Sequence, residues 1–167
     1  MLQRPLAAPA CASHLIGFDG RRLPRLATDV LVIGGGLAGA VAALTAAEAG
    51  ASVLVLAKDV LAECNTAYAQ GGIAAVLDAG GCDAGDSLDL HLRDTLAAGA
   101  GLVDEAAARS VLAGGAAAIR FLEAHGCRFD AEGGRPHLGR EGGHHARRIL
   151  HAGGDATGAG IAAALAK

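Results

Sequence analysis

The chain has 167 residues, 52% of them apolar and 19% charged, and its formal net charge of −3 comes without a block of like charges. This composition predicts a globular domain and excludes a disordered chain, as well as the basic surface that nucleic acid or an anionic membrane requires. Apolar stretches are interrupted well before the roughly 20 residues of a bilayer span, and a signal-peptide core is missing, so we expect a cytoplasmic protein.

Four cysteines stand at positions 11, 64, 82 and 127, and no two of them have the two-residue gap of a zinc knuckle or a redox dithiol. We therefore expect free thiols in a reducing compartment. Aromatic side chains are scarce and glycine reaches 26 residues, so a ligand can contact backbone at many places.

The first predicted elements form a βαβ unit. Residues 1–27 lack a sustained hydrophobic period and are interpreted as a surface arm ahead of a domain over 28–167. Residues 29–33 (DVLVI) are apolar on both faces, which predicts a strand buried on both sides in a parallel sheet. A helix over 37–49 and a second buried strand over 52–57 are predicted to follow.

A loop and two helices are predicted next. Small and turn-prone residues dominate the segment 63–72, which indicates a loop. Helices are predicted over 86–98 and 104–125, the second capped by Asp104 and ended by Gly126.

The last part of the chain has little periodicity. Beyond Phe129 it is dense in Gly, His and Arg until a new helix begins near Thr157. The chain stops at Lys167 inside that helix without a C-cap, so we expect a fragment of a longer protein.

Gly34, Gly36 and Gly39 have the spacing of a dinucleotide-binding fingerprint. The first allows a tight turn, the second a close approach of pyrophosphate, and the third close packing of helix on strand. The pyrophosphate is expected at the positive end of the helix that starts near Leu37. The alternative is a turn with a structural role alone; the strand before it and the helix after it favour nucleotide binding.

The acidic residue that usually binds the ribose hydroxyls at the end of the second strand is replaced by Lys58, with Asp59 after it. This departs from a plain NAD site. Lys58 could meet a 2′-phosphate, could lay its stem over adenosine, or could be a solvated charge at the end of a strand.

A metal site is one interpretation of the His-rich segment, whose candidate ligands are Cys127, His137, His144, His145 and His151. Their spacing matches no zinc motif such as HExxH, and arginines at 140, 147 and 148 would repel a cation. We therefore expect no metal. Two interpretations stay open for the Arg and His side chains. They either line an entrance that attracts a dicarboxylate, or they are solvated charges on a surface loop.

The sequence resembles the amino-terminal third of L-aspartate oxidases over about residues 29–165, through DVLVIGGGLAG, VLVLAK, NTAYAQGGIAAV, DTLAAGAG and REGGHHARRILHAGGDATG. The most specific pieces are YAQGGIAA and REGG with RRILH. These enzymes belong to the succinate dehydrogenase and fumarate reductase flavoprotein superfamily, in which Lys at the end of the second strand is familiar. The resemblance implies an α/β fold: a Rossmann-like FAD-binding βαβ unit with a parallel sheet, plus helices leading toward a substrate-capping region, in an incomplete domain.

The resemblance assigns the FAD pyrophosphate to the glycine turn, the adenosine side to Lys58, and the flavin and its linker to the loop that follows. The implied cofactor-binding residues are Gly34, Gly35, Gly36, Leu37, Ala38, Gly39, Lys58, Asn65, Thr66, Ala67, Tyr68, Ala69, Gln70, Gly71 and Gly72. Gly71 and Gly72 leave room for a flat isoalloxazine on backbone. Asn65 stands where the dehydrogenase and reductase branch carries the histidine that attaches flavin, so we expect non-covalent FAD.

Glu141, in REGG, stands where the resembled family orients the substrate amino group. A carboxylate there pairs with the ammonium of L-aspartate, which succinate lacks. The alternative is a loop glutamate paired with Arg140, Arg147 or Arg148. The family often has His-Ser-His where this chain has HHA at 144–146, so the role of the second family histidine is not carried over.

The resemblance implies FAD-dependent oxidation of L-aspartate to iminoaspartate, with oxygen or fumarate as electron acceptor. The product would feed quinolinate and NAD biosynthesis, with quinolinate synthase as a partner, and no nucleic acid or membrane partner is expected. The family's catalytic Arg lies beyond residue 167, so the fragment itself is expected to be inactive. Two alternatives stay open: a fumarate reductase or succinate dehydrogenase flavoprotein, disfavoured by Asn65 and Glu141, and a non-catalytic, truncated nucleotide-binding module.

Overall fold

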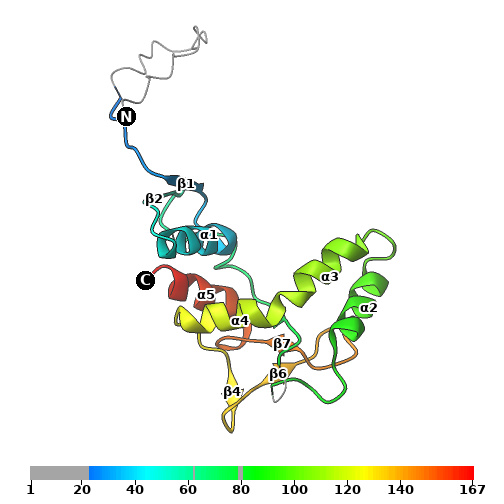
Figure 1. Cartoon of the computed structure of the whole chain (residues 1–167). Helices are drawn as coiled ribbons and strands as arrows, with labels where there is room; N and C mark the ends of the chain where they lie inside the picture. Colours follow the sequence, from blue (N-terminus) through cyan, green and yellow to red (C-terminus); the bar gives the residue numbers. More distant parts are fainter. Residues whose placement is uncertain (1–22, 62, 79–80) are drawn as a thin grey trace.

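The computed structural model describes residues 23–61, 63–78 and 81–167. Figure 1 shows a βαβ unit near the amino terminus, followed by a group of helices and short strands. Of the predicted arm, residues 1–22 lie outside the described part, and residues 23–27 are exposed and belong to no helix or strand.

The βαβ unit has the predicted parallel pairing. Strands β1 (Val30–Ile33) and β2 (Val53–Leu56) pair in parallel, and helix α1 (Leu37–Glu48) connects them. Gly50 has a φ of 87°, which lets the chain leave the helix and turn into β2. The predicted α/β class is therefore confirmed.

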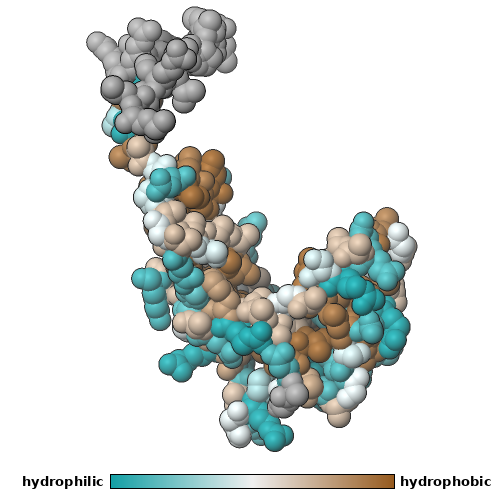
Figure 2. Space-filling view, viewed as in Figure 1, coloured by the Kyte–Doolittle hydropathy of each residue, from teal (hydrophilic) through white to brown (hydrophobic). Residues whose placement is uncertain are grey.

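The sheet of β1 and β2 is covered on one face only among the described residues, which corrects the expectation of strands buried on both sides. Burial alternates along both strands, and the half-buried side chains lie toward α1. On the other face, Ile33 is 78% exposed and Leu56 is 56% exposed. Figure 2 shows apolar surface gathered over β1. The apolar pattern is typical of strands that are packed on both faces, and the described residues pack against only one face of β1 and β2.

Helix α2 (Leu88–Ala98) begins two residues later than predicted. The Oγ atom of Ser87 accepts a hydrogen bond from the backbone N–H of Leu90 at 3.1 Å, so Ser87 is the N-cap. Asp86 does not cap the helix, because its carboxylate binds Arg148 instead.

The single helix predicted over 104–125 is wrong, because the chain forms two helices, α3 (Glu105–Ala113) and α4 (Gly115–Ala124). Asp104 caps α3 as predicted, with its Oδ1 accepting from Ala107 N at 2.8 Å. The break falls at Gly114, whose N–H turns to the carbonyl of Val111. Glycine is a weak helix former, so two adjacent glycines interrupt the helix readily.

Short antiparallel strands occupy the segment in which the sequence showed no period. Strand β7 (Ile149–Leu150) lies between β3 (Ile73–Ala74) and β6 (Leu138–Gly139). Strands β4 (Ala131–Glu132) and β5 (Arg135–Pro136) form a separate hairpin. Two-residue strands are too short for alternation to appear in a sequence window.

The helix predicted near Thr157 is confirmed as α5 (Thr157–Leu165), preceded by the 3₁₀ turn η2 (Gly154–Ala156). Helix α5 packs against α1 and α4, and so connects the βαβ unit to the rest of the fold. No helix within the described ranges is long and apolar enough to span a bilayer.

The buried core lies away from β1 and β2, around α4, α5 and β7. One cluster holds Leu122, Cys127, Ala152, Ile161 and Ala164. A second cluster holds Ala75, Ile119 and Leu150. The thiols of Cys64, Cys82 and Cys127 are free, and Cys11 lies outside the described residues.

Candidate functional site

The glycine turn has the geometry that its spacing predicts. Gly34 has a φ of 109°, a left-handed conformation that favours glycine, and its N–H donates to Leu56 O at 2.9 Å. A Cβ atom on Gly39 would overlap the carbonyl oxygen of Gly34 and lie 3.3 Å from Cγ1 of Val32. The tight turn and the close packing of α1 on β1 are therefore both present.

The loop over 65–72 lies directly against this turn. The backbone N–H of Leu37, in the first turn of α1, donates to Oγ1 of Thr66 at 2.9 Å. The N–H of Gly158, in the first turn of α5, donates to Ala69 O at 3.1 Å, and a Cβ on Gly158 would overlap the carbonyl oxygen of Thr66. The loop is thus held between the amino-terminal ends of two helices, and the structure brings together two segments that the sequence singled out separately.

Gly71 and Gly72 differ in what surrounds them. Gly71 is exposed, and a Cβ added there would meet nothing within 4 Å, so its backbone is open to a ligand. A Cβ on Gly72 would overlap the carbonyl oxygen of Leu150 and lie 2.5 Å from Cγ2 of Ile149. The packing of β7 therefore already explains the glycine at 72 without a flavin.

The remaining predicted cofactor residues lie mostly on the surface. Lys58, just beyond β2, is exposed, as are Asn65 and Gln70. Tyr68 is 64% exposed, and its hydroxyl donates to Oε1 of Glu63. That hydrogen bond and the charge of Glu63 raise the pKa of Tyr68. This part of the loop is free to meet a ligand from solvent.

Glu141 is half exposed, and its ion-pair partner among the described residues is a histidine. Its Oε1 lies 3.4 Å from Nε2 of His151, the residue that follows β7. The described part of the chain shows no ion pair between Glu141 and Arg140, Arg147 or Arg148, which were the partners of the alternative interpretation.

Arg148 is fully buried, which sequence reasoning missed. Its guanidinium binds both carboxylate oxygens of Asp86, at 2.7 and 3.1 Å, and donates to Oδ2 of Asp94 at 2.7 Å. The exposed fraction is 0% for the Arg148 side chain and 1% and 3% for the two aspartates. Arg148 therefore neither lines an entrance for an anion nor is a solvated charge on a surface loop. A partial signal was present, because Arg148 directly precedes Ile149 and Leu150, the two buried apolar residues of β7.

Asp94 also fixes the segment that follows Glu141. Its carboxylate accepts from the backbone N–H of His145 at 3.0 Å and lies 2.5 Å from Nδ1 of the same residue. Burial alone would raise the pKa of Asp94, but hydrogen bonds from His145 and Arg148 and the charge of Arg148 outweigh it and lower the pKa to about 2. Asp94 is therefore a buried anion at neutral pH.

Two more histidines border this cluster. The rings of His91 and His144 lie 5.5 Å apart, and Nδ1 of His91 is buried without a hydrogen-bond partner among the described residues. Burial lowers the pKa of His91, and the charges of Arg148 and His144 lower it further. Within the described ranges, no group of three or more His, Cys, Asp or Glu side chains is arranged to hold a metal ion.

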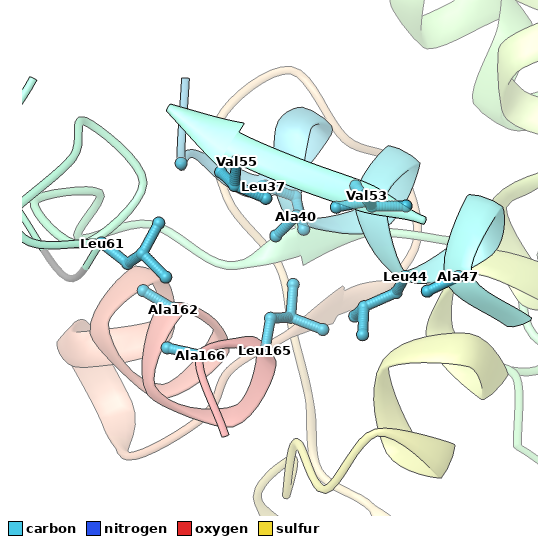
Figure 3. A pocket seen from close by; sticks show the side chains of 12 residues that line it. Leu37, Ala40, Leu44, Ala47, Val53, Val55, Leu61, Ala162, Leu165 and Ala166 are labelled. Atoms are coloured by element: carbon cyan, nitrogen blue, oxygen red, sulfur yellow. The ribbon is translucent and has the colours of Figure 1, made fainter. Parts of the chain in front are cut away.

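An apolar cavity of about 220 Å³ lies between α1, β2 and α5. Figure 3 shows side chains of all three elements pointing into it, among them Leu44, Val53 and Leu165, with Leu61 at one end. None of its lining side chains is titratable, so the cavity offers no acid or base. The cavity lies at the interface between α5 and the βαβ unit.

Comparison with known proteins matches the chain to one family and to relatives that are named L-aspartate oxidase. A family described as FAD binding domain matches residues 29–167. L-aspartate oxidase of Mycobacterium tuberculosis is 54% identical over 143 residues, covering 84% of this chain and 26% of the relative. L-aspartate oxidase of Arabidopsis thaliana, a chloroplastic protein, is 49% identical over 138 residues, covering 82% of this chain and 20% of the relative. The chain thus spans about a quarter of the length of its curated relatives.

Solved structures show the same fold. Mycobacterium smegmatis Sdh1 superposes with a TM-score of 0.79 at 33% identity, covering 86% of this chain and 24% of that chain. An Escherichia coli quinol fumarate reductase gives 0.74 at 29% identity, with coverages of 83% and 23%. The resemblance to L-aspartate oxidases within the succinate dehydrogenase and fumarate reductase flavoproteins is therefore confirmed. Since the family match includes the glycine turn, the loop over 65–72 and Glu141, the chain belongs to the FAD binding domain family, and its cofactor is FAD.

Proposed function

We propose that the protein containing this chain is an FAD-dependent L-aspartate oxidase, which oxidises L-aspartate to iminoaspartate. The observation that carries the proposal is the 46–54% identity to L-aspartate oxidases from several organisms. We assign residues 28–167 to the amino-terminal part of the FAD-binding domain.

The residues present fit FAD. Gly36, the N-cap of α1, provides no side-chain cap, and Ala38 in the first turn is exposed, so the positive end of α1 can receive a phosphate. The open backbone at Gly71 can receive a flat ring. We propose that the turn from Gly34 to Gly39 holds the pyrophosphate, Lys58 the adenosine side, and the loop over 65–72 the flavin.

Bound FAD would supply the acceptor for the hydride that leaves the α-carbon of the substrate. The role that we propose for Glu141 is to pair with the substrate ammonium, and so to orient the α-carbon and to reject succinate, which lacks this charge. Its half-exposed carboxylate supports this role, because it lies 3.4 Å from His151, whose ring borders Gly72 of the loop over 65–72. None of the described arginines forms an ion pair with it.

The activity is proposed for a protein of the relatives' length, with oxygen or fumarate as acceptor and quinolinate synthase as consumer of the imine on the way to NAD. The 167 residues alone are proposed to be inactive. The apolar face of β1 and β2, which is uncovered among the described residues, supports this, because such a face requires a partner layer.

The function is tested by anaerobic titration of the flavin absorbance of the full-length protein. We expect L-aspartate to bleach the flavin and succinate to leave it oxidised. In Glu141→Gln, kcat/KM for L-aspartate should fall about 100-fold, since the ammonium of the bound substrate loses its charge partner, whereas fumarate reduction should change by less than about 3-fold. Bleaching by succinate alone would overturn the proposal, and equal losses in both reactions would remove the role of Glu141.

Non-covalent FAD is a separate expectation, which depends on Asn65. Asn lacks the ring nitrogen that forms a covalent bond to flavin, and the exposed Asn65 leaves no other nucleophile at this position. After acid precipitation of the holoprotein, we expect the yellow colour in the supernatant. A yellow pellet would contradict the expectation.

A second candidate function is a succinate dehydrogenase or fumarate reductase flavoprotein, favoured by the TM-scores of 0.79 and 0.74 to such structures. Asn65 and Glu141 speak against it. The same titration separates the two candidates, because succinate would then be the reductant.

A further inference from the structure

His151 occupies a confined position between two strands of the β3–β7–β6 sheet. It follows β7, and its carbonyl oxygen accepts from Asp130 N at 2.8 Å. A Cβ on Gly139 would lie 3.0 Å from Cε1 of the ring, and a Cβ on Gly72 would lie 3.0 Å from Nε2. A Cβ atom at either neighbouring position would crowd the imidazole, so the two glycines provide the space in which the ring lies.

The ring of His151 reaches the carboxylate of Glu141. Nε2 of His151 lies 3.4 Å from Oε1 of Glu141, and the His151 side chain is 22% exposed. Glu141 has no such support from its own segment, since Gly142 and Gly143 follow it and Gly143 has a φ of 84°. A long, half-exposed side chain beside two glycines loses considerable conformational entropy when it is held in one geometry.

We propose that His151 is a positioning residue of the substrate site: its ring, which borders Gly72 at the end of the loop over 65–72, holds the Glu141 carboxylate in place and so sets the preference for an amino dicarboxylate over succinate. This rests on the proposed function. A carboxylate that is held in place before the substrate binds does not lose that freedom on binding, so the histidine improves binding of the ammonium without touching the substrate.

The test compares variants of the full-length protein loaded with FAD. In His151→Ala, the KM for L-aspartate should rise about 10-fold, while kcat, FAD content and fumarate reduction change by less than about 3-fold. In His151→Gln, whose amide can donate from nearly the same place, KM should return to within about 3-fold of wild type. In a Glu141→Gln background, His151→Ala should have no further effect on KM, because the histidine acts through that carboxylate.

A matched control is available in this chain. His125 and Glu48 form another His–Glu pair, at 3.1 Å with 20% and 60% exposed side chains, at the carboxyl-terminal ends of α4 and α1. His125→Ala should leave the KM for L-aspartate unchanged. An unchanged KM in His151→Ala, or a full additional loss in the Glu141→Gln background, would overturn this inference alone. A wild-type flavin that L-aspartate does not bleach would overturn the proposed function and this inference with it.

Discussion

Arg148→Ala is expected to lower the free energy of unfolding of the full-length, FAD-loaded protein by about 3–5 kcal/mol, the cost of removing one partner of a buried ion pair. Arg148 is completely buried, and its removal leaves two buried carboxylates, Asp86 and Asp94, without their cation. The three residues connect α2 and the segment before it to β7, so the loss affects the packing of distant parts of the chain. Urea unfolding followed by circular dichroism measures the change.

The matched control is an exposed arginine pair. Arg109 lies 2.9 Å from Asp89, but the two side chains are 49% and 69% exposed. Arg109→Ala should therefore cost less than about 1 kcal/mol. Equal losses in the two variants would show that the burial of Arg148 has no energetic importance.

The same cluster gives a dependence on pH with a defined sign. The pKa of Asp94 is lowered from 3.8 to about 2 in the folded protein, so its contribution to stability is fully present above pH 4 and is lost as the pH falls toward 2. The loss amounts to about 2 kcal/mol. Urea midpoints measured between pH 5 and pH 2 should show it for wild type and show less of it for Asp94→Asn.

Gly39→Ala is expected to lower the affinity for FAD by about 100-fold or more, because overpacking against fixed backbone costs several kcal/mol. The new methyl group would overlap the carbonyl oxygen of Gly34, which belongs to the turn itself, and press on Val32. The helix can make room only by moving away from β1, and its amino-terminal end then leaves the pyrophosphate position. Retained flavin per protein after gel filtration measures the effect.

Gly160→Ala is the matched control within another helix. A Cβ on Gly160 in α5 would lie 3.4 Å from Cβ of Ala152, which is an ordinary contact. Alanine is the better helix former, so this variant should keep FAD and gain up to about 1 kcal/mol in stability. Loss of FAD in both variants would mean that any added methyl group is harmful, and the argument from the Gly34 carbonyl would fail.

The βαβ unit could be predicted from the sequence because each of its signals is local. The apolar runs, the three glycines and the Ala-rich helix all lie within about 30 consecutive residues, and each position has one physical task. The exposure of one sheet face could not be predicted in this way. An apolar residue such as Ile33 indicates that this face packs against another segment, but the sequence pattern does not identify that segment.

Features that depend on residues far apart in the sequence were missed. The helix predicted to begin at Asp86 begins at Leu88, and only the approach of Arg148, 62 positions later, shows that the Asp86 carboxylate binds elsewhere. The glycine at 72 was assigned to a flavin, whereas the backbone of β7 occupies the space next to it. In both cases the tertiary structure adds a contact that explains the residue type, and the sequence pattern alone does not show that contact.

The loop over 65–72 is held by the first turn of α1 on one side and the first turn of α5 on the other, at positions 37 and 158. A ligand that requires this loop in one conformation therefore binds only the state in which both helices are docked. Cofactor affinity and folding are then linked quantities: bound FAD shifts the unfolding equilibrium of the whole unit by mass action, not that of the glycine turn alone. By the same linkage, a substitution that loosens α5 weakens FAD binding without touching the cofactor.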